Sequence, residues 1–239
     1  MIELVNLSKQ YGTFTAVNNI HLTIPAGEIF GFLGPNGAGK TTTIKMLAGL
    51  TRPRSGRVMI GGASVEESRV RERVGFMPEA PYFYDRLTGM EFLKFCGDLF
   101  VRHPKSTAGY GELLERVGIF AARHKPIATY SKGMKQRLAF ASALVNDPDY
   151  LLLDEPLDGL DPIGRAEIKA IIAHLHRAGK TVFFNSHILY DTEELCDSIG
   201  ILHQGALLYA GPVEEFCAGK TLEERFVEVV GAHVHHPKT

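Results

Sequence analysis

One glycine-rich segment of the chain has the residue types and the spacing that bind a phosphate group. It has glycine at its first and sixth positions, followed by Lys40 and Thr41. The glycines let the backbone curl so that several N–H groups point inward, and a helix that starts here adds the positive end of its dipole. Lys40 can neutralise the β- and γ-phosphates of a nucleotide, and the Thr41 hydroxyl can ligate Mg²⁺. We expect phosphate contacts from Gly34, Pro35, Asn36, Gly37, Ala38, Gly39, Lys40, Thr41 and Thr42.

Two adjacent carboxylates follow an apolar run later in the chain. Leu151-Leu152-Leu153 predicts a buried strand, and Asp154 and Glu155 come directly after it. Because parallel strands end at the ligand-binding edge of a sheet, we expect these carboxylates beside the glycine-rich segment. Asp154 would hold Mg²⁺, directly or through water, and Glu155 would orient or deprotonate the water that attacks the γ-phosphate. Alone, such a pair is also compatible with a solvated turn, but its pairing with the glycine-rich segment favours the catalytic interpretation.

Strand patterns alternate with helix patterns over most of the chain, which predicts a mostly parallel sheet covered by helices on both faces. The glycine-rich segment lies between an expected strand at 29–33 and an expected helix at 41–50, and this context argues against a turn that matches by chance. Another expected helix begins at Asp161-Pro162 and ends at Gly179. The further expected strands are at 58–60, 74–77, 150–153, 181–184, 199–202 and 206–209, the last two forming a hairpin.

Residues 81–146 interrupt this alternation, because strand patterns vanish there and the segment predicts several helices with an aromatic-rich start. Near the N-terminus, apolar residues alternate between Ile2 and Ile24 and predict further strands. We therefore expect a single domain over residues 1–239. Its parts are a nucleotide-binding core with a β-subdomain from 1–80 and 147–218, a helical insertion at 81–146, and a C-terminal helix with a flexible tail at 219–239.

The composition excludes several classes of protein. Hydrophobic residues make up 45% and charged residues 22% of the 239 residues, which is typical of a globular chain. Lys and Arg number 26 against 27 for Asp and Glu, and the net charge of -1 argues against a dedicated nucleic-acid binder. No apolar run approaches the roughly 18 residues of a membrane span, and the N-terminus lacks a signal-peptide pattern, so we expect a soluble, cytoplasmic protein. A reducing compartment also suits the three separated cysteines, Cys96, Cys196 and Cys217.

A third motif lies between the glycine-rich segment and the two carboxylates. It runs Tyr130-Ser131-Lys132-Gly133-Met134-Lys135-Gln136-Arg137, ahead of an expected helix that extends to about Val145. It resembles the signature motif of ATP-binding cassette (ABC) ATPases, which is usually Leu-Ser-Gly-Gly-Gln and which other phosphate-loop families lack. The order of glycine-rich segment, signature, acidic strand and Ser186-His187 is similar to that family over nearly the whole chain.

The resemblance implies an α/β fold of the P-loop NTPase type, with a RecA-like, mostly parallel sheet, an N-terminal antiparallel β-subdomain and an inserted helical subdomain. Tyr11 resembles the aromatic residue that stacks on adenine, and the alternative is an ordinary tyrosine at a strand end. His187 resembles the switch histidine that contacts the γ-phosphate, whereas an isolated histidine would more often be structural. The signature residues that the resemblance places on the γ-phosphate, at the start of a helix, are Ser131, Gly133 and Met134.

The sequence departs from the usual pattern of the family at three positions. Glu79 takes the place of a glutamine that serves Mg²⁺ and water, and an ionised carboxylate cannot donate a hydrogen bond as an amide does. We still expect Glu79 at the metal, with Thr41 and Asp154. Lys132 and Met134 replace the usual glycine and glutamine of the signature. These two changes, with the Gly-Leu-Asp-Pro sequence at 159–162, resemble the branch that serves ABC-2 type exporters.

The resemblance also implies partners. In ABC ATPases two cassettes pack head to tail, with each ATP between one phosphate loop and the other signature helix, and a loop similar to residues 156–161 crosses the interface. We expect a homodimer, or a pair with a homologous ATPase subunit. The implied function is ATP hydrolysis, with ATP and Mg²⁺, on the cytoplasmic face of the cell membrane for an exporter with separate permease subunits. Tyr82, Phe83 and Tyr84 are expected to line the groove that receives a permease helix, and the alternative is a place in the core.

Two other functions are compatible with the motifs: a soluble ABC ATPase acting on a ribosome or a DNA repair complex, and a nucleotide-gated regulator without turnover. A near-neutral charge and a single cassette without a basic or coiled-coil insertion count against the first, and the presence of Glu155 and His187 counts against the second.

Three features are assigned no site. These are His174 and His176 on different sides of a helix, the solvated charge run at 66–73, and His233, His235 and His236 in a tail expected to be disordered.

Overall fold

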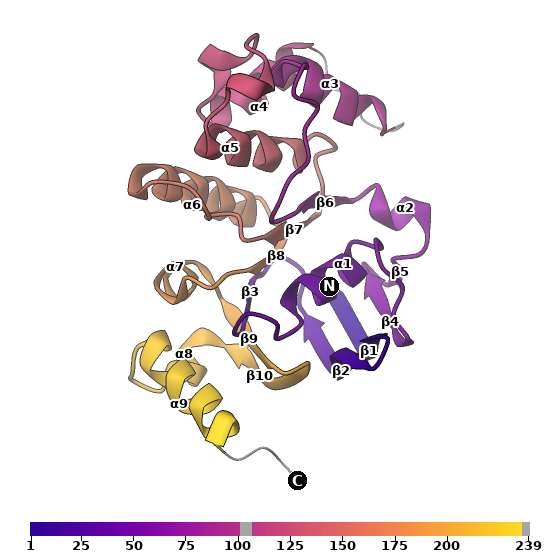
Figure 1. Cartoon of the computed structure of the whole chain (residues 1–239), viewed down its shortest axis with the longest axis vertical. Helices are drawn as coiled ribbons and strands as arrows, with labels where there is room; N and C mark the ends of the chain where they lie inside the picture. Colours follow the sequence, from indigo (N-terminus) through magenta and orange to yellow (C-terminus); the bar gives the residue numbers. More distant parts are fainter. Residues whose placement is uncertain (101–106, 236–239) are drawn as a thin grey trace.

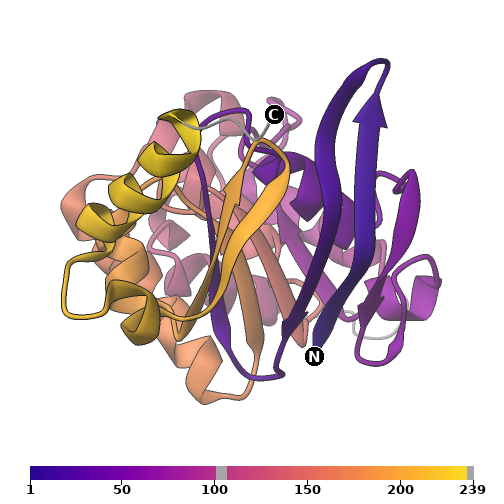
Figure 2. The same cartoon turned by 90° about the horizontal axis from the view of Figure 1, so that it is seen from below.

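The computed structural model describes residues 1–100 and 107–235 and arranges their strands in two sheets (Figure 1). The first sheet is antiparallel, with the strand order β2-β1-β4-β5. Figure 2 shows the long hairpin of its first two strands standing beside the second sheet. The predicted N-terminal strands are therefore confirmed. The strands of this sheet are β1 (Ile2–Tyr11), β2 (Phe14–Ile24), β4 (Ser55–Ile60) and β5 (Ala63–Ser64).

The second sheet has the order β10-β9-β3-β8-β7-β6, and its pairs are parallel except for β9 with β10. This confirms the predicted mostly parallel sheet, and the predicted hairpin near its end is the β9–β10 pair. The strands of this sheet are β3 (Ile29–Leu33), β6 (Val74–Met77), β7 (Tyr150–Asp154), β8 (Thr181–Asn185), β9 (Ser198–His203) and β10 (Ala206–Pro212).

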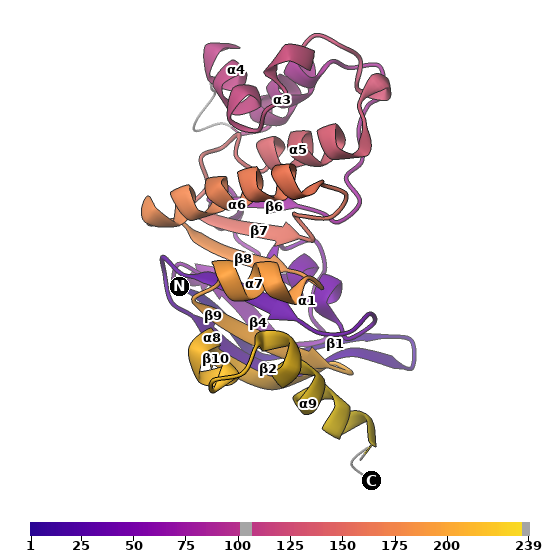
Figure 3. The same cartoon turned by 90° about the vertical axis from the view of Figure 1, so that its left-hand side faces the viewer.

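The helices form groups at different places around the second sheet (Figure 1, Figure 3). Those of the expected insertion lie at one end of the molecule, beyond β6 and β7, and those that follow β8 lie toward the other end. The first group is α3 (Gly89–Asp98), α4 (Thr107–Arg116) and α5 (Lys132–Ser142), with 3₁₀ turns at Phe120–Ala122 and Ile127–Thr129. The others are α1 (Lys40–Leu47), α2 (Ser68–Arg71), α6 (Pro162–Arg177), α7 (Leu189–Leu195), α8 (Val213–Cys217) and α9 (Leu222–His235).

The central strands of the second sheet are buried on both faces, which explains their continuous apolar runs. Successive side chains of a strand point to opposite faces. Leu152 of β7 and Phe183 of β8 belong to a core that also contains Ile44 of α1 and the inner face of the antiparallel sheet. Leu151 and Phe184 belong to a second core, shared with the helices α3 to α6. Helix α1 is thus packed between the two sheets, with its first residue directly after the glycine-rich segment.

Helix ends follow from local chemistry, and two differ from the prediction. Helix α6 starts as predicted, because Asp161 accepts a hydrogen bond from the Gly164 N–H (2.7 Å). Helix α1 ends at Leu47 instead of residue 50, because Gly49 is left-handed (φ 70°) and the Leu50 N–H bonds the Lys45 carbonyl (2.9 Å). Helix α5 ends at Ser142 instead of about Val145. Ala143 still bonds the Ala139 carbonyl, but Leu144 and Val145 make i→i−3 hydrogen bonds to Ala141 and Ser142 and form a turn.

The C-terminal segment corrects one expectation. The prediction of disorder is wrong for His233 and His235, because α9 continues through them. The helix is held by its apolar face, on which Leu222 and Val230 are buried against β9 and α8. The remaining residues of the expected tail, 236–239, with His236, lie outside the described part of the chain.

The three aromatic residues expected in a groove divide between core and surface. Phe83 is 8% exposed and packs edge to face on Phe92, with ring centroids 5.0 Å apart, so the prediction is wrong for this residue and the core alternative holds. Tyr82 and Tyr84 are exposed, by 84% and 52%. Their rings stack edge to face with one another (6.2 Å), and that of Tyr84 also contacts Phe95 of α3 (5.6 Å).

Within residues 1–100 and 107–235, no helix has both the length and the apolar character to cross a bilayer. No group of three or more His, Cys, Asp or Glu side chains in those residues is arranged to hold a metal ion. His176 instead lies 3.4 Å from the Asp197 carboxylate. Cys96, Cys196 and Cys217 are free thiols, and burial raises the pKa of Cys96 to about 11.

The two-sided burial of β7 predicts a large cost for opening a cavity there. Leu152→Ala should lower the free energy of unfolding by about 2 to 5 kcal/mol, because the Leu152 side chain is fully buried in the core that β7 shares with α1. Leu50→Ala, the same change at a side chain that is 63% exposed, should stay within about 0.5 kcal/mol. Urea denaturation of both variants measures the difference, and equal losses would contradict the assigned burial.

Candidate functional site

The glycine-rich loop leaves the end of β3 and closes at the first turn of α1. Gly39 precedes the helix with φ 110°, a conformation that glycine tolerates and other residues do not. A side chain is also excluded by contact, since a Cβ at Gly39 would lie 2.2 Å from the Ala16 carbonyl oxygen and one at Gly34 would lie 2.2 Å from that of Leu202. The backbone of the loop is therefore available as a lining surface, and glycine is required at both positions.

Lys40 is buried inside this loop. Its Nζ donates hydrogen bonds to the carbonyl oxygens of Gly34 (2.7 Å) and Pro35 (3.2 Å), so the ammonium group is held at the centre of the loop. Burial lowers the pKa of Lys40, and the nearby carboxylates of Glu155, Asp154 and Glu79 oppose this shift. The N–H groups of the first turn of α1 have no partner within the helix and are available to an anion.

A hollow of about 380 Å³ opens in front of the loop and brings several predicted residues together. Glu79 and Glu155 line it from the ends of β6 and β7, on the side of the hollow where the two parallel strands end. It contains all of the predicted loop residues from Asn36 to Thr42, whereas Gly34 and Pro35 line a neighbouring hollow with His187. The residues that line the first hollow are Phe14, Ala16, Asn36, Gly37, Ala38, Gly39, Lys40, Thr41, Thr42, Glu79 and Glu155.

Asp154 is the last residue of β7 and is almost fully buried. Its Oδ1 accepts a hydrogen bond of 2.7 Å from the side-chain amide of Asn185, which lies opposite it on β8. Burial raises the pKa of Asp154, and hydrogen bonds from Asn185 and Thr41 oppose the rise. Thr41 and Asp154 therefore lie within hydrogen-bonding reach of each other, as the sequence predicts for two ligands of one cation.

Glu155 and His187, the two predicted catalytic residues, lie in contact with each other. The Nδ1 atom of His187 lies 2.8 Å from Oε2 of Glu155, and the same oxygen accepts a hydrogen bond from the His187 backbone N–H (3.3 Å). Burial raises the pKa of Glu155, and the charge and hydrogen bonds of His187 oppose the rise. The side chain of Glu155 is 12% exposed, whereas that of His187 is 56% exposed. The carboxylate is therefore held in one orientation at the edge of the hollow.

Asp154 does not line this hollow, and four other predicted residues line neither this hollow nor its neighbour within the single chain. Ser131, Gly133 and Met134 lie at the start of α5, where the Ser131 hydroxyl accepts a hydrogen bond from the Met134 N–H (3.2 Å) and caps the helix. Tyr11 lies at the end of β1, half exposed, with the Lys9 ammonium 5.1 Å from its ring centre. The aromatic residue that does line the hollow is Phe14, directly across the hairpin from Tyr11.

The sequence analysis did not predict Phe14 and Ala16 in the lining of the hollow, nor Asn185 and Gln136 beside Asp154 and Glu155. Phe14 carries a signal, since it is the next aromatic residue after Tyr11 and a turn of two residues separates them. Asn185 carries another, because it is a polar residue at the end of an apolar strand that pairs with β7. Gln136 is buried in α5 and donates a hydrogen bond to the Glu155 carbonyl (2.9 Å), and no pattern in the sequence predicts that contact.

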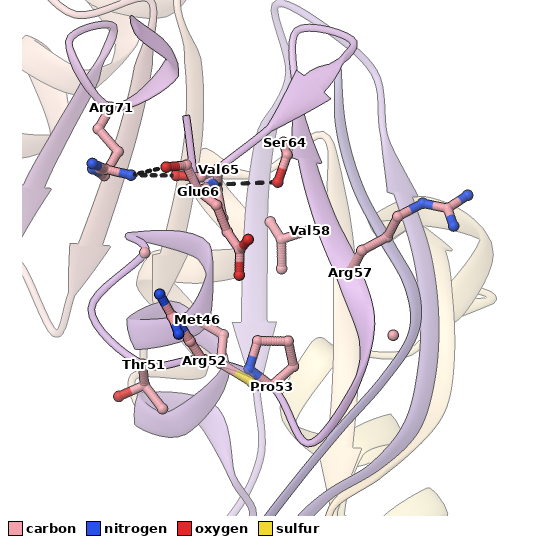
Figure 4. A pocket seen from close by; sticks show the side chains of 12 residues that line it. Met46, Thr51, Arg52, Pro53, Arg57, Val58, Ser64, Val65, Glu66 and Arg71 are labelled. Carbon is pink, nitrogen blue, oxygen red and sulfur yellow. Dashed lines mark hydrogen bonds between the residues drawn. The ribbon is translucent and has the colours of Figure 1, made fainter. Parts of the chain in front are cut away.

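A larger hollow, of about 450 Å³, lies near the opposite end of α1 (Figure 4). Met46 and Gly49 line it on the helix side, and Arg71 closes it through hydrogen bonds from Nη1 to the carbonyls of Val65 (2.9 Å) and Glu66 (2.6 Å). An α-helix rises about 1.5 Å per residue, so the length of α1 separates this hollow from the glycine-rich loop. It contains no predicted site residue, and the smaller hollow is the candidate site.

The chain is similar to known proteins of one family. A family model described as ABC transporter matches residues 17–158. The chain is 47% identical over 197 residues to an uncharacterized ABC transporter ATP-binding protein of Nostoc sp., an alignment that covers 81% of this chain and 59% of that protein. It is 44% identical to the bacitracin transport ATP-binding protein BcrA of Enterococcus faecalis (87% and 68% covered). It is 36% identical to the lantibiotic transport ATP-binding protein SrtF of Streptococcus pyogenes (95% and 96% covered).

The relatives differ in length from this chain. The chain spans 59% and 64% of the lengths of the Nostoc and Synechocystis relatives that it matches. It spans nearly all of SrtF, at 96%. The match to the ATP-binding region is thus common to the relatives, and some of them carry additional sequence.

Solved structures show the same fold. The structure of an ATP-binding subunit of an ABC transporter is 30% identical with a TM-score of 0.87, over 96% of this chain and 99% of that one. A dimeric, post-hydrolysis structure of the ATP-binding cassette MJ0796, bound to ADP and Pi, is 26% identical with a TM-score of 0.80, over 89% and 99%. The family match covers more than half of the sequence and the relatives align over most of it, so the chain belongs to the ATP-binding proteins of the ABC transporter family.

Proposed function

We propose that this chain binds ATP with Mg²⁺ and hydrolyses it as the ATP-binding subunit of a membrane exporter. The observation that carries the proposal is the position of Glu155, whose carboxylate is held by His187 and opens on the same hollow as Lys40 and Thr41. A loop that only bound phosphate would not need a buried, oriented carboxylate at its edge. Two relatives named for bacitracin and lantibiotic transport favour an exporter over an ABC ATPase acting on a ribosome or on DNA.

The side chains present fit a hydrated divalent cation. Three carboxylates, those of Asp154, Glu155 and Glu79, influence the ammonium of Lys40, and a bound triphosphate would bring further negative charge to them. Oδ1 of Asn185 is buried beside Asp154 and has no hydrogen-bond partner among the described residues, which suits a water molecule of a hydrated ion. Thr41 and Asp154 would hold Mg²⁺, with Glu79 beside them, and the ion would neutralise charge on the phosphate oxygens.

Each residue of the hollow then has a defined task. Lys40 and the N–H groups at the start of α1 bind the β- and γ-phosphates. Glu155 accepts a proton from the attacking water, and its raised pKa makes it a stronger base than an ordinary glutamate. His187 fixes the Glu155 carboxylate and places its own exposed ring toward the γ-phosphate. A base of this kind contributes about 10² to 10⁴ in rate.

A second cassette completes the site in this proposal. Ser131, Gly133 and Met134 do not line the hollow of their own chain, so their helix end is free to meet the γ-phosphate bound by another copy or by a homologous subunit. The dimeric MJ0796 cassette, which shares this fold, supports that arrangement. We place the pair at the cytoplasmic face of the membrane, with the helical block at 81–146 turned toward a separate permease.

Glu155→Gln tests the proposal directly. The amide cannot accept the proton of the attacking water, so ATP turnover should fall by at least about 100-fold while ATP still binds. The variant should accumulate an ATP-bound dimer, which size-exclusion chromatography with light scattering detects.

Two matched variants control that experiment. Glu66→Gln makes the same chemical change at an exposed glutamate beside the larger hollow and should turn over normally. Lys40→Ala removes the cation of the loop and should abolish tight ATP binding, and with it the dimer. Wild-type turnover by Glu155→Gln would remove Glu155 as the base and overturn the proposed reaction.

The position of Phe14 predicts which aromatic residue contacts the base of the nucleotide. Stacking of a base on an aromatic ring is worth about 1 to 3 kcal/mol, so Phe14→Ala should weaken ATP binding by roughly 5- to 150-fold. Tyr11→Ala should weaken it less, because Tyr11 does not line the hollow. Titration with a fluorescent ATP analogue measures both, and the opposite order would give Tyr11 the role that the family resemblance implies.

The exposed ring cluster of Tyr82, Tyr84 and Phe95 is proposed as the permease contact. Replacing both tyrosines by alanine should lower co-sedimentation of the chain with membranes of its native cells by about tenfold, since an aromatic anchor contributes about 1 to 3 kcal/mol. ATP binding should be unchanged. Val227→Ala on α9, 63% exposed at the other end of the molecule, is the control. Membrane association that survives the double substitution would place the contact elsewhere.

A further inference from the structure

Glu155 has a backbone conformation that its neighbours must hold. Its φ is 53°, in the left-handed region, which costs a residue with a Cβ about 1 kcal/mol. Its N–H donates to the Asn185 carbonyl (3.1 Å), and its own carbonyl accepts from the N–H of Asp158 (3.2 Å). Gln136, which belongs to α5, donates a third hydrogen bond, to the same Glu155 carbonyl (2.9 Å). The direction of the carboxylate thus depends on contacts that the backbone of Glu155 makes.

Gln136 is an unusual residue to find in this place. It is 5% exposed and belongs to α5, whose residues Leu138 and Phe140 lie in the helical core. A buried amide that loses its partner costs about 1 to 3 kcal/mol, so the bond to Glu155 is maintained once it is formed. Through this bond, the helix that begins at the signature motif is joined to the residue that carries the base.

A second contact joins the same helix to the same loop. The Lys132 ammonium lies 2.8 Å from Oδ2 of Asp158, and this ion pair lowers the pKa of Asp158. The stem of Lys132 lies over Gly159, where an added Cβ would be 2.5 Å from Cε. Glycine at 159 is thus what allows the lysine to lie along the loop. Both charged side chains are exposed, by 72% and 45%, so the pair contributes at most about 1 kcal/mol to stability.

We infer that α5 sets the position of Glu155, with Gln136 as a positioning residue and the Lys132–Asp158 pair as a second point of attachment. The inference rests on the proposed function, in which Glu155 is the base. The groups of the same chain that bind the phosphates come from α1 and its loop, and the two contacts do not touch them. Loss of either contact should therefore lower the rate of hydrolysis and leave the nucleotide affinity of that chain unchanged.

The first experiment removes the buried bond. Gln136→Leu keeps the size of the side chain and deletes its donor, and kcat for ATP should fall by about 10- to 100-fold, because displacement of a catalytic group by about 1 Å has effects of this size. KM and the dissociation constant for an ATP analogue should stay within about twofold of wild type. This split between kcat and KM separates positioning from general loss of structure.

Asn146→Leu is the matched control. Asn146 is 3% exposed, and its amide also donates to backbone carbonyls, those of Glu72 (2.9 Å) and Val74 (3.2 Å). These lie at the start of β6, whereas Glu155 follows the end of the neighbouring β7, a separation of about 15 Å at 3.3 Å per residue. Asn146→Leu should lose thermal stability comparably and keep its kcat. An equal fall of kcat in both variants, or none in Gln136→Leu, would overturn the assignment of Gln136.

A charge exchange at the surface tests the second attachment and does not depend on the folding of a core variant. Lys132→Asp should lower kcat by several-fold, and Lys132→Asp combined with Asp158→Lys should restore most of it at unchanged KM. If Lys132 acted only on a phosphate, the exchanged pair would stay inactive, and that result would overturn the pairing. Turnover that is normal in every Gln136 and Lys132 variant but absent in Glu155→Gln would reject this inference alone. Turnover that persists in Glu155→Gln would reject the proposed function.

Discussion

The burial of the central strands on both faces is the constraint on which the rest of the structure depends. Strands β3, β7 and β8 lie between two apolar cores, so polar groups are admitted only where each strand ends. Parallel pairing then brings those ends to one edge, and the register sets Asp154 directly opposite Asn185. A slip of one residue would turn every side chain of the strand to the other face. Hydrophobic packing of the strands therefore determines where the site lies, and the polar contacts of the site are made at that place.

At that edge of the sheet, groups of opposite charge lie close together in a site that is partly shielded from water. Burial raises the pKa of Asp154 and of Glu155 and lowers that of Lys40, so each charged form is less favoured than in water. Hydrogen bonds from Asn185 and His187 offset part of this for the two carboxylates. The three groups remain mutually dependent, and a cationic ligand relieves the repulsion between the carboxylates. In the proposed function, nucleotide and metal bound together would satisfy all three groups.

The sequence predicted the features that short-range patterns encode. The order of strands and helices, the glycine-rich loop and the place of Glu155 beside it follow from spacing and from the rule that parallel strands share a ligand edge, whereas His187 is predicted from the family resemblance. The features that were not predicted from the sequence depend on tertiary packing. Phe83 and its exposed neighbours are indistinguishable by residue type, and only the position of Phe92 decides which ring is buried. The hydrogen bond from Gln136 joins residues far apart in the chain, and a single sequence contains no signal for it.

The position of Lys40 in the loop has a consequence for the rate and the affinity with which the site binds a ligand. Lys40 already has its ammonium hydrogen-bonded to the carbonyls of Gly34 and Pro35, and this contact keeps the loop open around a cation. A long, flexible side chain ordinarily loses much rotamer freedom when it meets a ligand, and here that loss has occurred during folding. A triphosphate bound at this site would meet an ammonium group whose position is already set, and its oxygens would replace the two carbonyls as partners. Less side-chain entropy would then be lost on binding.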